Sequence, residues 1–214
     1  MNDAKVIWAT PDADKLLGYI ARVSNPANQD NPDVTRLLRY CAANHHWSVF
    51  EHAHACVEIN TTRDIARQIL RHRSFAFSEF SQRYADATQL GEFVTRECRL
   101  QDFKNRQNSL ATDDITLKLI WEEMQDKVAR DAKQAYAWAL DHGIAKEQAR
   151  ALLPEGLTPS RLYMTGSIRS WVTYLQVRLD PATQKEHREI ARQVLEALRP
   201  QAPVTFGAFF SEEV

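Results

Sequence analysis

Apolar residues recur every three or four positions in some segments of the chain and alternate with polar residues in others. Leu37, Leu38 and Cys41 follow the first pattern, which predicts an amphipathic helix over residues 33–43. Residues 54–60 follow the second pattern, which predicts a strand with one buried face. The predicted helices cover residues 13–22, 33–43, 62–72, 113–142, 146–153, 167–178 and 183–198. The predicted strands cover residues 5–9, 54–60 and 161–164.

Capping residues mark the ends of several of these segments. Thr61 or Thr62 can cap one helix, and Asp113 or Asp114 can open the longest one, which a glycine ends. Residues 86–111 carry scattered charge and give only a weak strand-or-loop prediction. Because neither a repeat nor a low-complexity linker divides the chain, we expect one α+β domain rather than two.

The composition is that of an ordinary globular protein. The chain has 214 residues, of which 44% are hydrophobic and 26% charged, and its formal net charge is −1. This balance argues against a dedicated nucleic-acid binder, whose charge normally biases the whole domain. Cys41, Cys56 and Cys98 lack metal-ligand spacing and indicate a reducing compartment. With no apolar run suited to a signal peptide or a membrane span, we expect a cytoplasmic protein without membrane or nucleic-acid partners.

The segment RHRSFAFSEFSQRY, residues 71–84, concentrates most of the candidate chemistry. Arg71, His72 and Arg73 stand at the predicted end of a helix, and Arg83 follows Ser81 by two residues. This mixture of cations and hydroxyls favours the binding of an anion and a ring. The alternative is structural, because cations at the end of a helix also complement its dipole.

The order of short motifs along the chain resembles that of the flavin-dependent thymidylate synthases. The signature of that family is Arg-His-Arg followed after seven residues by Ser, which residues 71–81 reproduce. The further matches are Ala21–Ser24, Phe50–His52, Ala66–Gln68, Arg150–Pro154, Thr165–Ser170 and Val177–Arg178. One such match alone is a weak signal, but together they extend in order over roughly residues 20–200.

This resemblance implies a fold and an activity. Members of the family methylate dUMP to dTMP, with 5,10-methylenetetrahydrofolate as the carbon donor and FAD, reduced by NADPH, as the hydride carrier. Their fold has a mixed central sheet flanked by long helices. Their sites are completed by neighbouring subunits of a homotetramer. For this chain, the resemblance therefore implies a single catalytic domain over residues 1–214.

The resemblance also assigns the substrate-binding residues. For dUMP these are Gln68, Arg71, Glu79, Ser81, Gln82, Arg83, Arg150 and Arg178. Forked guanidinium donors and a hydroxyl, as in Arg83, Arg150 and Ser81, suit a nucleotide phosphate. Arg178 is the expected catalytic residue, because it would stabilise negative charge that develops on the activated pyrimidine. The structural alternative is that Arg178 packs on Tyr174 and caps a helix end.

The residues that the resemblance assigns to FAD are His52, His54, Arg71, His72, Arg73, Glu79, Ser167, Arg169 and Thr173. Cations suit the charge of a reduced flavin and tune its electronics. We assign Ser81 to binding rather than nucleophilic attack, because no base with an orienting partner stands near it in the sequence. His45 and His46 lack further ligands at metal-binding spacing, so we expect no metal site.

Several positions depart from the family pattern. Ser78 stands where many members have Asn, Gln82 where many have Gly, and Ser167 and Thr173 where Asn is common. A histidine that other members carry soon after the position of Arg178 is missing. His187 either replaces it or is an exposed helix residue, and we expect the latter.

Two other classes of function compete with the enzyme. A single-strand RNA binder would stack bases on Phe75, Phe77 and Phe80, but the near-neutral charge disfavours it. A relative that has kept the fold and lost catalysis would not need to retain Gln68 and Arg178. Flavin that is bleached by NADPH in the presence of dUMP would separate the enzyme from the RNA binder, and dTMP formation would separate it from the inactive relative.

Overall fold

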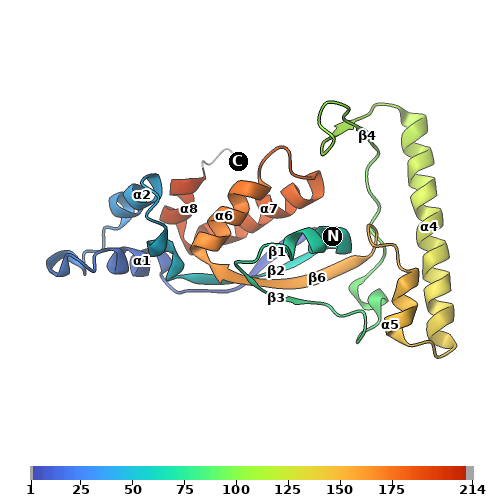
Figure 1. Ribbon diagram of the computed structural model, residues 1–214, viewed down its shortest axis with the longest axis horizontal. Coiled ribbons are helices and arrows are strands. Elements are labelled where there is room, and N and C mark those ends of the chain that lie inside the picture. Colours follow the sequence, from blue (N-terminus) through green and yellow to red (C-terminus); the bar gives the residue numbers. More distant parts are fainter. Residues whose placement is uncertain (1, 211–214) are drawn as a thin grey trace. The chain divides into compact units, whose positions relative to one another are not determined.

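The computed structural model of the protein describes residues 2–210 (Figure 1). They form two compact units. Unit 1 comprises Asn60–Arg71 and Glu79–Leu162 together with Asn2, and unit 2 comprises Asp3–Ile59, His72–Ser78 and the chain from Tyr163 to residue 210. The single catalytic domain over residues 1–214 stays a prediction.

The elements follow the apolar pattern closely. The strands are β1 (Asp3–Ala9), β2 (His54–Thr62), β3 (Ala76–Glu79), β4 (Arg99–Gln101), β5 (Ser109–Ala111) and β6 (Pro159–Ser167). The helices are α1 (Ala13–Ala21), α2 (Thr35–Ala43), α3 (Arg63–Ile69), α4 (Ile115–Asp141), α5 (Lys146–Ala149), α6 (Ile168–Arg178), α7 (Lys185–Leu198) and α8 (Pro203–Phe209). Short 3₁₀ turns are η1 (Pro26–Asn28), η2 (Trp47–Glu51), η3 (Ala87–Leu90), η4 (Arg150–Leu152) and η5 (Arg199–Gln201). The pattern does not predict β3 and α8.

The larger sheet has the strand order β1-β2-β6-β3, and β4 and β5 pair as a separate antiparallel hairpin. The α+β class is confirmed, but the larger sheet is antiparallel instead of mixed. Thr10, which follows β1, donates its N–H to the carbonyl of His54 at the start of β2. The hydroxyl of Thr61 near the end of β2 donates to Asn2, which precedes β1. The strands β2 and β3, which are joined through α3, lie on either side of β6. Because both pair antiparallel with β6, they run in the same direction, and the connection between them through α3 is a crossover within the sheet.

The core of unit 2 is built on α6 and α7. Trp171 and Leu175 of α6 and Ile190 and Val194 of α7 are fully buried, and α7 packs against both α6 and β1. The indole Nε1 of Trp171 donates to the carbonyl of Ala55 in β2 at 3.2 Å. Periodic burial on these two helices fixes which of their polar residues must also lie inside.

Unit 1 contains α3 and α4. Ile65, Ala66 and Ile69 form the buried face of α3. Tyr136 and Ala139 of α4 pack in a small cluster with Ala87 and Ala149. Many other apolar side chains of α4 are exposed, among them Ile115, Leu119, Ile120, Trp121, Met124 and Val128.

The predicted capping residues behave as their chemistry requires, with one exception. Asp114 accepts from the backbone N–H of Leu117 at 2.9 Å. Ser167, the first residue of the predicted helix 167–178, also acts as a cap and accepts from the backbone N–H of Ser170 at 3.2 Å. Thr62 occupies the N-cap of α3, but its hydroxyl donates to Asp64 instead of accepting from the backbone. Over residues 2–210, no helix has both the length and the apolar character that crossing a bilayer requires.

Candidate functional site

The basic triplet follows a helix directly, as predicted. The helix α3 ends at Ile69, so Arg71, His72 and Arg73 lie in the turn between α3 and β3. The side chains of Arg71 and Arg73 are exposed, and that of His72 is half-buried. The strand β3 then carries the motif to Glu79, which places its last residues in unit 1 and His72 and Arg73 in unit 2.

In unit 1, Glu79 is held by two groups that the sequence does not reveal. Its carboxylate lies 3.5 Å from Arg63 and accepts from the hydroxyl of Ser160 at 2.7 Å. Burial lowers the pKa of Arg63, which the charge of Glu79 opposes and those of Arg67 and Arg150 reinforce. The positive charges of Arg67 and Arg150 therefore both act on Arg63. The spacing of four between Arg63 and Arg67 was the available signal for Arg63.

Arg83 and Arg150 come together at Glu147 of α5. A terminal nitrogen of Arg83 lies 3.2 Å from the Glu147 carboxylate, and Arg150 Nε donates to the Glu147 carbonyl at 3.3 Å. Arg83 and Arg150 are 67 positions apart in the sequence. Ser81, two residues before Arg83, is exposed, and its carbonyl accepts from the N–H groups of Tyr84 and Ala85 at 3.0 Å. Two arginines whose guanidinium donors can bind a phosphate thus contact the same residue.

Gln82 is the buried member of the motif. Its side chain is only 4% exposed, and within the described residues its Nε2 has no hydrogen-bond partner. A buried amide without a partner is unfavourable by roughly 1–3 kcal/mol, so such groups call for an explanation. A ligand that presents an acceptor would satisfy it. Gln68, in contrast, is half-buried on α3, and Arg71 N donates to its carbonyl at 3.4 Å.

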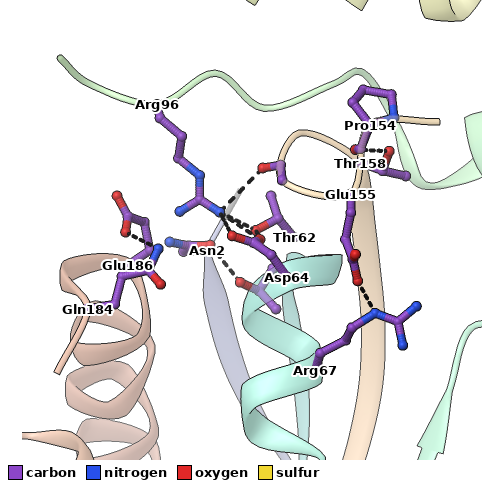
Figure 2. A network of polar contacts seen from close by, with 12 residues as sticks. Asn2, Thr62, Asp64, Arg67, Arg96, Pro154, Glu155, Thr158, Gln184 and Glu186 are labelled. Carbon is purple, nitrogen blue, oxygen red and sulfur yellow. Dashed lines mark hydrogen bonds and ion pairs between the residues drawn. The ribbon is translucent and has the colours of Figure 1, made fainter. Parts of the chain in front are cut away.

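A second network in unit 1 supports the start of α3 (Figure 2). Arg96 reaches Asp64 at 2.8 and 3.0 Å and the hydroxyl of Thr62 at 2.6 Å. The amide of Gln125, on α4, bonds to both the N–H and the carbonyl of Arg96. Arg67, which lies farther along α3, forms an ion pair with Glu155 (Figure 2). These contacts tie the helix that precedes the basic triplet to the rest of unit 1.

In unit 2, the predicted catalytic residue contacts the motif. Arg178 Nε donates to His72 Nε2 at 2.9 Å, although 106 residues separate them. Because an arginine can only donate, Nε2 must carry the lone pair, and the proton of a neutral His72 lies on Nδ1. Burial, and then the charge of Arg178, lowers the pKa of His72 to about 4. His72 is therefore neutral at physiological pH.

The expectation that His187 is an exposed helix residue is wrong. Its side chain is fully buried, and its Nε2 lies 3.1 Å from the hydroxyl of Tyr174, which is also fully buried. The position follows from helix periodicity, since His187 shares one face of α7 with Ile190, Ala191 and Val194. Burial lowers the pKa of His187 to about 3, helped by the charge of Arg178, and raises that of Tyr174. Both groups are thus neutral.

The other predicted flavin residues on α6 have partners within unit 2. Arg169 pairs with Glu51, and its guanidinium lies 5.9 Å from the ring centre of Trp47. The hydroxyl of Thr173 donates to the carbonyl of Arg169 at 3.1 Å, and Ser167 caps α6. His52 and His54 are exposed at the start of β2.

The donors of unit 2 fit a flavin chemically. Arg73 offers an exposed guanidinium, and the neutral ring of His72 offers an Nδ1–H donor beside it. A cation and an N–H donor suit the carbonyl-rich edge of an isoalloxazine. Of the predicted FAD residues, all but Arg71 and Glu79 belong to unit 2. Of the predicted dUMP residues, all but Arg178 belong to unit 1.

The chain matches one protein family over nearly its whole length. The family model described as "Thymidylate synthase complementing protein" matches residues 5–204. The flavin-dependent thymidylate synthase of Synechocystis sp. is 54% identical over 176 residues, which cover 82% of this chain and 80% of that one. A probable flavin-dependent thymidylate synthase of Paramecium bursaria Chlorella virus 1 is 43% identical over 199 residues, covering 92% and 91%.

A solved structure agrees with these sequence matches. The UMP/dUMP methylase PolB from Streptomyces cacaoi, bound with 5-Br dUMP, superposes with a TM-score of 0.78 at 27% identity. The alignment covers 98% of this chain and 94% of PolB. The match therefore extends through both units of the chain.

Proposed function

We propose that this chain, which belongs to the flavin-dependent thymidylate synthase family, forms dTMP from dUMP with 5,10-methylenetetrahydrofolate as carbon donor and FAD, reduced by NADPH, as hydride carrier. Membership of the family makes the chain a flavin-dependent methyltransferase that synthesises thymidylate. The identity of the flavin as FAD and the two co-substrates are the proposed details. PolB, which is crystallised with 5-Br dUMP, supports dUMP as the substrate.

The hydrogen bond from Arg178 to His72 carries the catalytic part of the proposal. The guanidinium has five N–H donors, of which Nε is committed to a neutral ring. That bond restricts the orientation of the side chain without neutralising its charge. We assign to Arg178 the stabilisation of negative charge on the pyrimidine while its C5–H bond is broken.

In this proposal, residues of unit 1 bind the phosphate and the sugar of the substrate. Arg83 and Arg150 would bind the phosphate, and Ser81 would orient it. Gln82 would donate from its unpartnered amide to an oxygen of the nucleotide. Gln68, Arg71 and Glu79 complete the proposed dUMP set, with Glu79 held in place by Arg63 and Ser160.

In the same proposal, residues of unit 2 provide most of the contacts to the flavin. His72 and Arg73 would hold the isoalloxazine, with His52, His54, Arg71, Glu79, Ser167, Arg169 and Thr173 as further proposed contacts. When bound, FAD supplies the hydride that reduces the transferred one-carbon unit. The role of Arg169 would require its guanidinium to serve the cofactor while it pairs with Glu51.

We further propose a homotetramer in the cytoplasm. The exposed apolar side chains of α4 support this assembly, since patches of this kind on a monomer mark interaction surfaces. A subunit that buried Ile120, Met124 and Val128 would remove them from water. Sedimentation equilibrium of the purified protein would test the number of subunits.

The decisive experiment follows the flavin and the substrate separately. The purified protein is expected to be yellow, and its flavin absorbance should bleach anaerobically with NADPH when dUMP is present. Addition of the folate should then release tritium from dUMP labelled at C5 and yield dTMP. A colourless protein, or one that bleaches without releasing tritium, would overturn the proposed reaction.

A further inference from the structure

A fully buried hydrogen-bonded pair, Tyr174 and His187, has no role among the substrate and flavin contacts proposed above. Their side chains are 0% exposed, and the Tyr174 hydroxyl and His187 Nε2 lie 3.1 Å apart. The two residues come from different helices, α6 and α7. A buried polar pair has to be hydrogen-bonded to be tolerated, and apolar residues of similar volume would pack at least as favourably. Stability alone therefore does not account for this pair.

The pair lies next to the two residues that carry the proposed chemistry of unit 2. The ring of Tyr174 meets the ring of His72 edge to face, with 4.9 Å between centres. Tyr174 and Arg178 are four residues apart on α6 and therefore share a face of this helix. The charge of Arg178 acts on both His72 and His187. The four side chains form one group in the order His187, Tyr174, His72 and Arg178.

The protonation states make this group internally consistent. His72 must be neutral to accept from Arg178, and a cationic His187 would add a second buried charge close to that guanidinium. A neutral His187 instead offers Tyr174 a polar partner without repelling Arg178. The Tyr174 ring, fixed at its hydroxyl, then forms a rigid wall against one face of the His72 site.

We infer that Tyr174 and His187 are positioning residues, which fix the ring of His72 and thereby the orientation in which the Arg178 guanidinium stabilises negative charge on the pyrimidine. This inference rests on the proposed function. It predicts that the hydroxyl–imidazole bond matters for turnover more than for binding, because Arg178 is assigned to the transition state. A displacement of a catalytic group by about 1 Å can reduce the rate up to a hundredfold.

Three variants test the inference in the flavin-loaded enzyme. Tyr174→Phe removes only the hydroxyl, His187→Leu removes the imidazole, and His187→Gln keeps an amide able to bond to Tyr174. For the first two, kcat should fall about tenfold while the KM for dUMP changes less than about threefold. His187→Gln should retain kcat within about threefold. Tyr19→Phe makes the same chemical change at an exposed position of α1 and should leave both constants as they are.

The outcomes separate the inference from the proposed function. If wild-type protein releases no tritium from labelled dUMP, the proposed function fails before any variant is measured. If the wild type is active and both Tyr174→Phe and His187→Leu keep its kcat, the positioning role is wrong. Equal losses in His187→Gln and His187→Leu would also overturn it, because packing rather than the hydrogen bond would then matter. If His187→Leu does not fold, Tyr174→Phe alone decides, since its shape is almost unchanged.

Discussion

The charged residues of the proposed dUMP set in unit 1 and the group around Arg178 in unit 2 are held in different ways. Unit 1 gathers full charges in exposed or half-buried ion pairs, such as Arg83 with Glu147 and Arg63 with Glu79. Unit 2 buries neutral groups, Tyr174 and His187, beside one cation, Arg178. Exposed cations can exchange a carboxylate for a phosphate at little cost, because water screens both states. Buried neutral donors cannot exchange partners, and they suit a site in which geometry must stay fixed.

This contrast agrees with the division of labour that we propose. Capture of the nucleotide phosphate would use the charged set, and stabilisation of the reacting ring would use the buried set. Changes in unit 1 should then affect KM and salt dependence, whereas changes in unit 2 should affect kcat and the response to pH.

The largest expected effect is on stability at acidic pH. Folding lowers the pKa of His187 from 6.5 to about 3, so the unfolded chain binds the proton more tightly. The part of the unfolding free energy that depends on the protonation of His187 is fully present above pH 6.5. It falls by about 1.4 kcal/mol per pH unit below that value and is lost near pH 3. The total is on the order of 5 kcal/mol. Urea unfolding at pH 7.5, 6, 5 and 4 should show this decline.

A variant isolates the contribution of His187 from the general acid response. His187→Gln cannot take up the proton, so its unfolding free energy should depend less steeply on pH than that of the wild type. His72, with a folded pKa of about 4, should preserve part of the slope in that variant. Parallel curves for the two proteins would mean that His187 is not buried as a neutral group, and the contrast between the units would lose its basis.

The next effect is the loss of Arg178. Arg178→Ala should reduce turnover about 10³-fold, equivalent to roughly 4 kcal/mol, because a group aimed at developing charge is removed. Flavin content should stay near that of the wild type. Arg178→Lys should not restore activity, since lysine lacks the Nε–H that bonds to His72. Turnover at the wild-type rate in Arg178→Ala would refute the catalytic assignment.

Arg73→Ala provides the counterpart within the same unit. Arg73 is exposed and is assigned to the flavin, so this variant should lose colour on gel filtration. The remaining bound fraction should turn over at a rate close to normal. Full retention of flavin would remove Arg73 from the proposed cofactor contacts.

A smaller effect is expected at Gln82. Gln82→Met removes the unpartnered Nε2 while almost keeping the volume, so the unfolding temperature without ligand should stay equal or rise. If dUMP accepts from this amide, its KM should rise about tenfold and the thermal shift it causes should shrink. Gln89→Met, at an exposed glutamine of the same unit, is the control. An unchanged thermal shift in Gln82→Met would show that the amide does not contact the nucleotide.

The sequence predicts the elements well because local patterns determine them. A helix cap such as Asp114 can be predicted from a single residue. The strand β3 is not predicted because its residues, Ala76–Glu79, do not alternate between apolar and polar. The direction of the sheet strands depends on pairing between distant segments, which no single segment encodes.

The site shows the same division. The sequence motifs assign both Arg178 and His72 to the candidate site, but they do not predict the hydrogen bond between these residues. No other candidate residue lies near His187 in the sequence, but its helical phase with Ile190 and Val194 of α7 predicts that it is buried. Arg63 and Ser160 are missed because they act on Glu79, and such supporting contacts leave no motif.

The smallest predicted effect tests whether the ion pairs of unit 1 are exchangeable. The side chains of Arg83 and Glu147 are 65% and 48% exposed, so the pair contributes less than about 1 kcal/mol to stability. Glu147→Gln should therefore leave unfolding unchanged and free Arg83 for the phosphate, lowering the KM for dUMP up to about threefold. The gain should shrink at high salt, because the interaction is screened there. Glu155→Gln, which frees Arg67 instead, should not change KM. A rise in KM for Glu147→Gln would mean that Glu147 orients Arg83 for binding, and the charged set of unit 1 would then be as fixed as the buried set of unit 2.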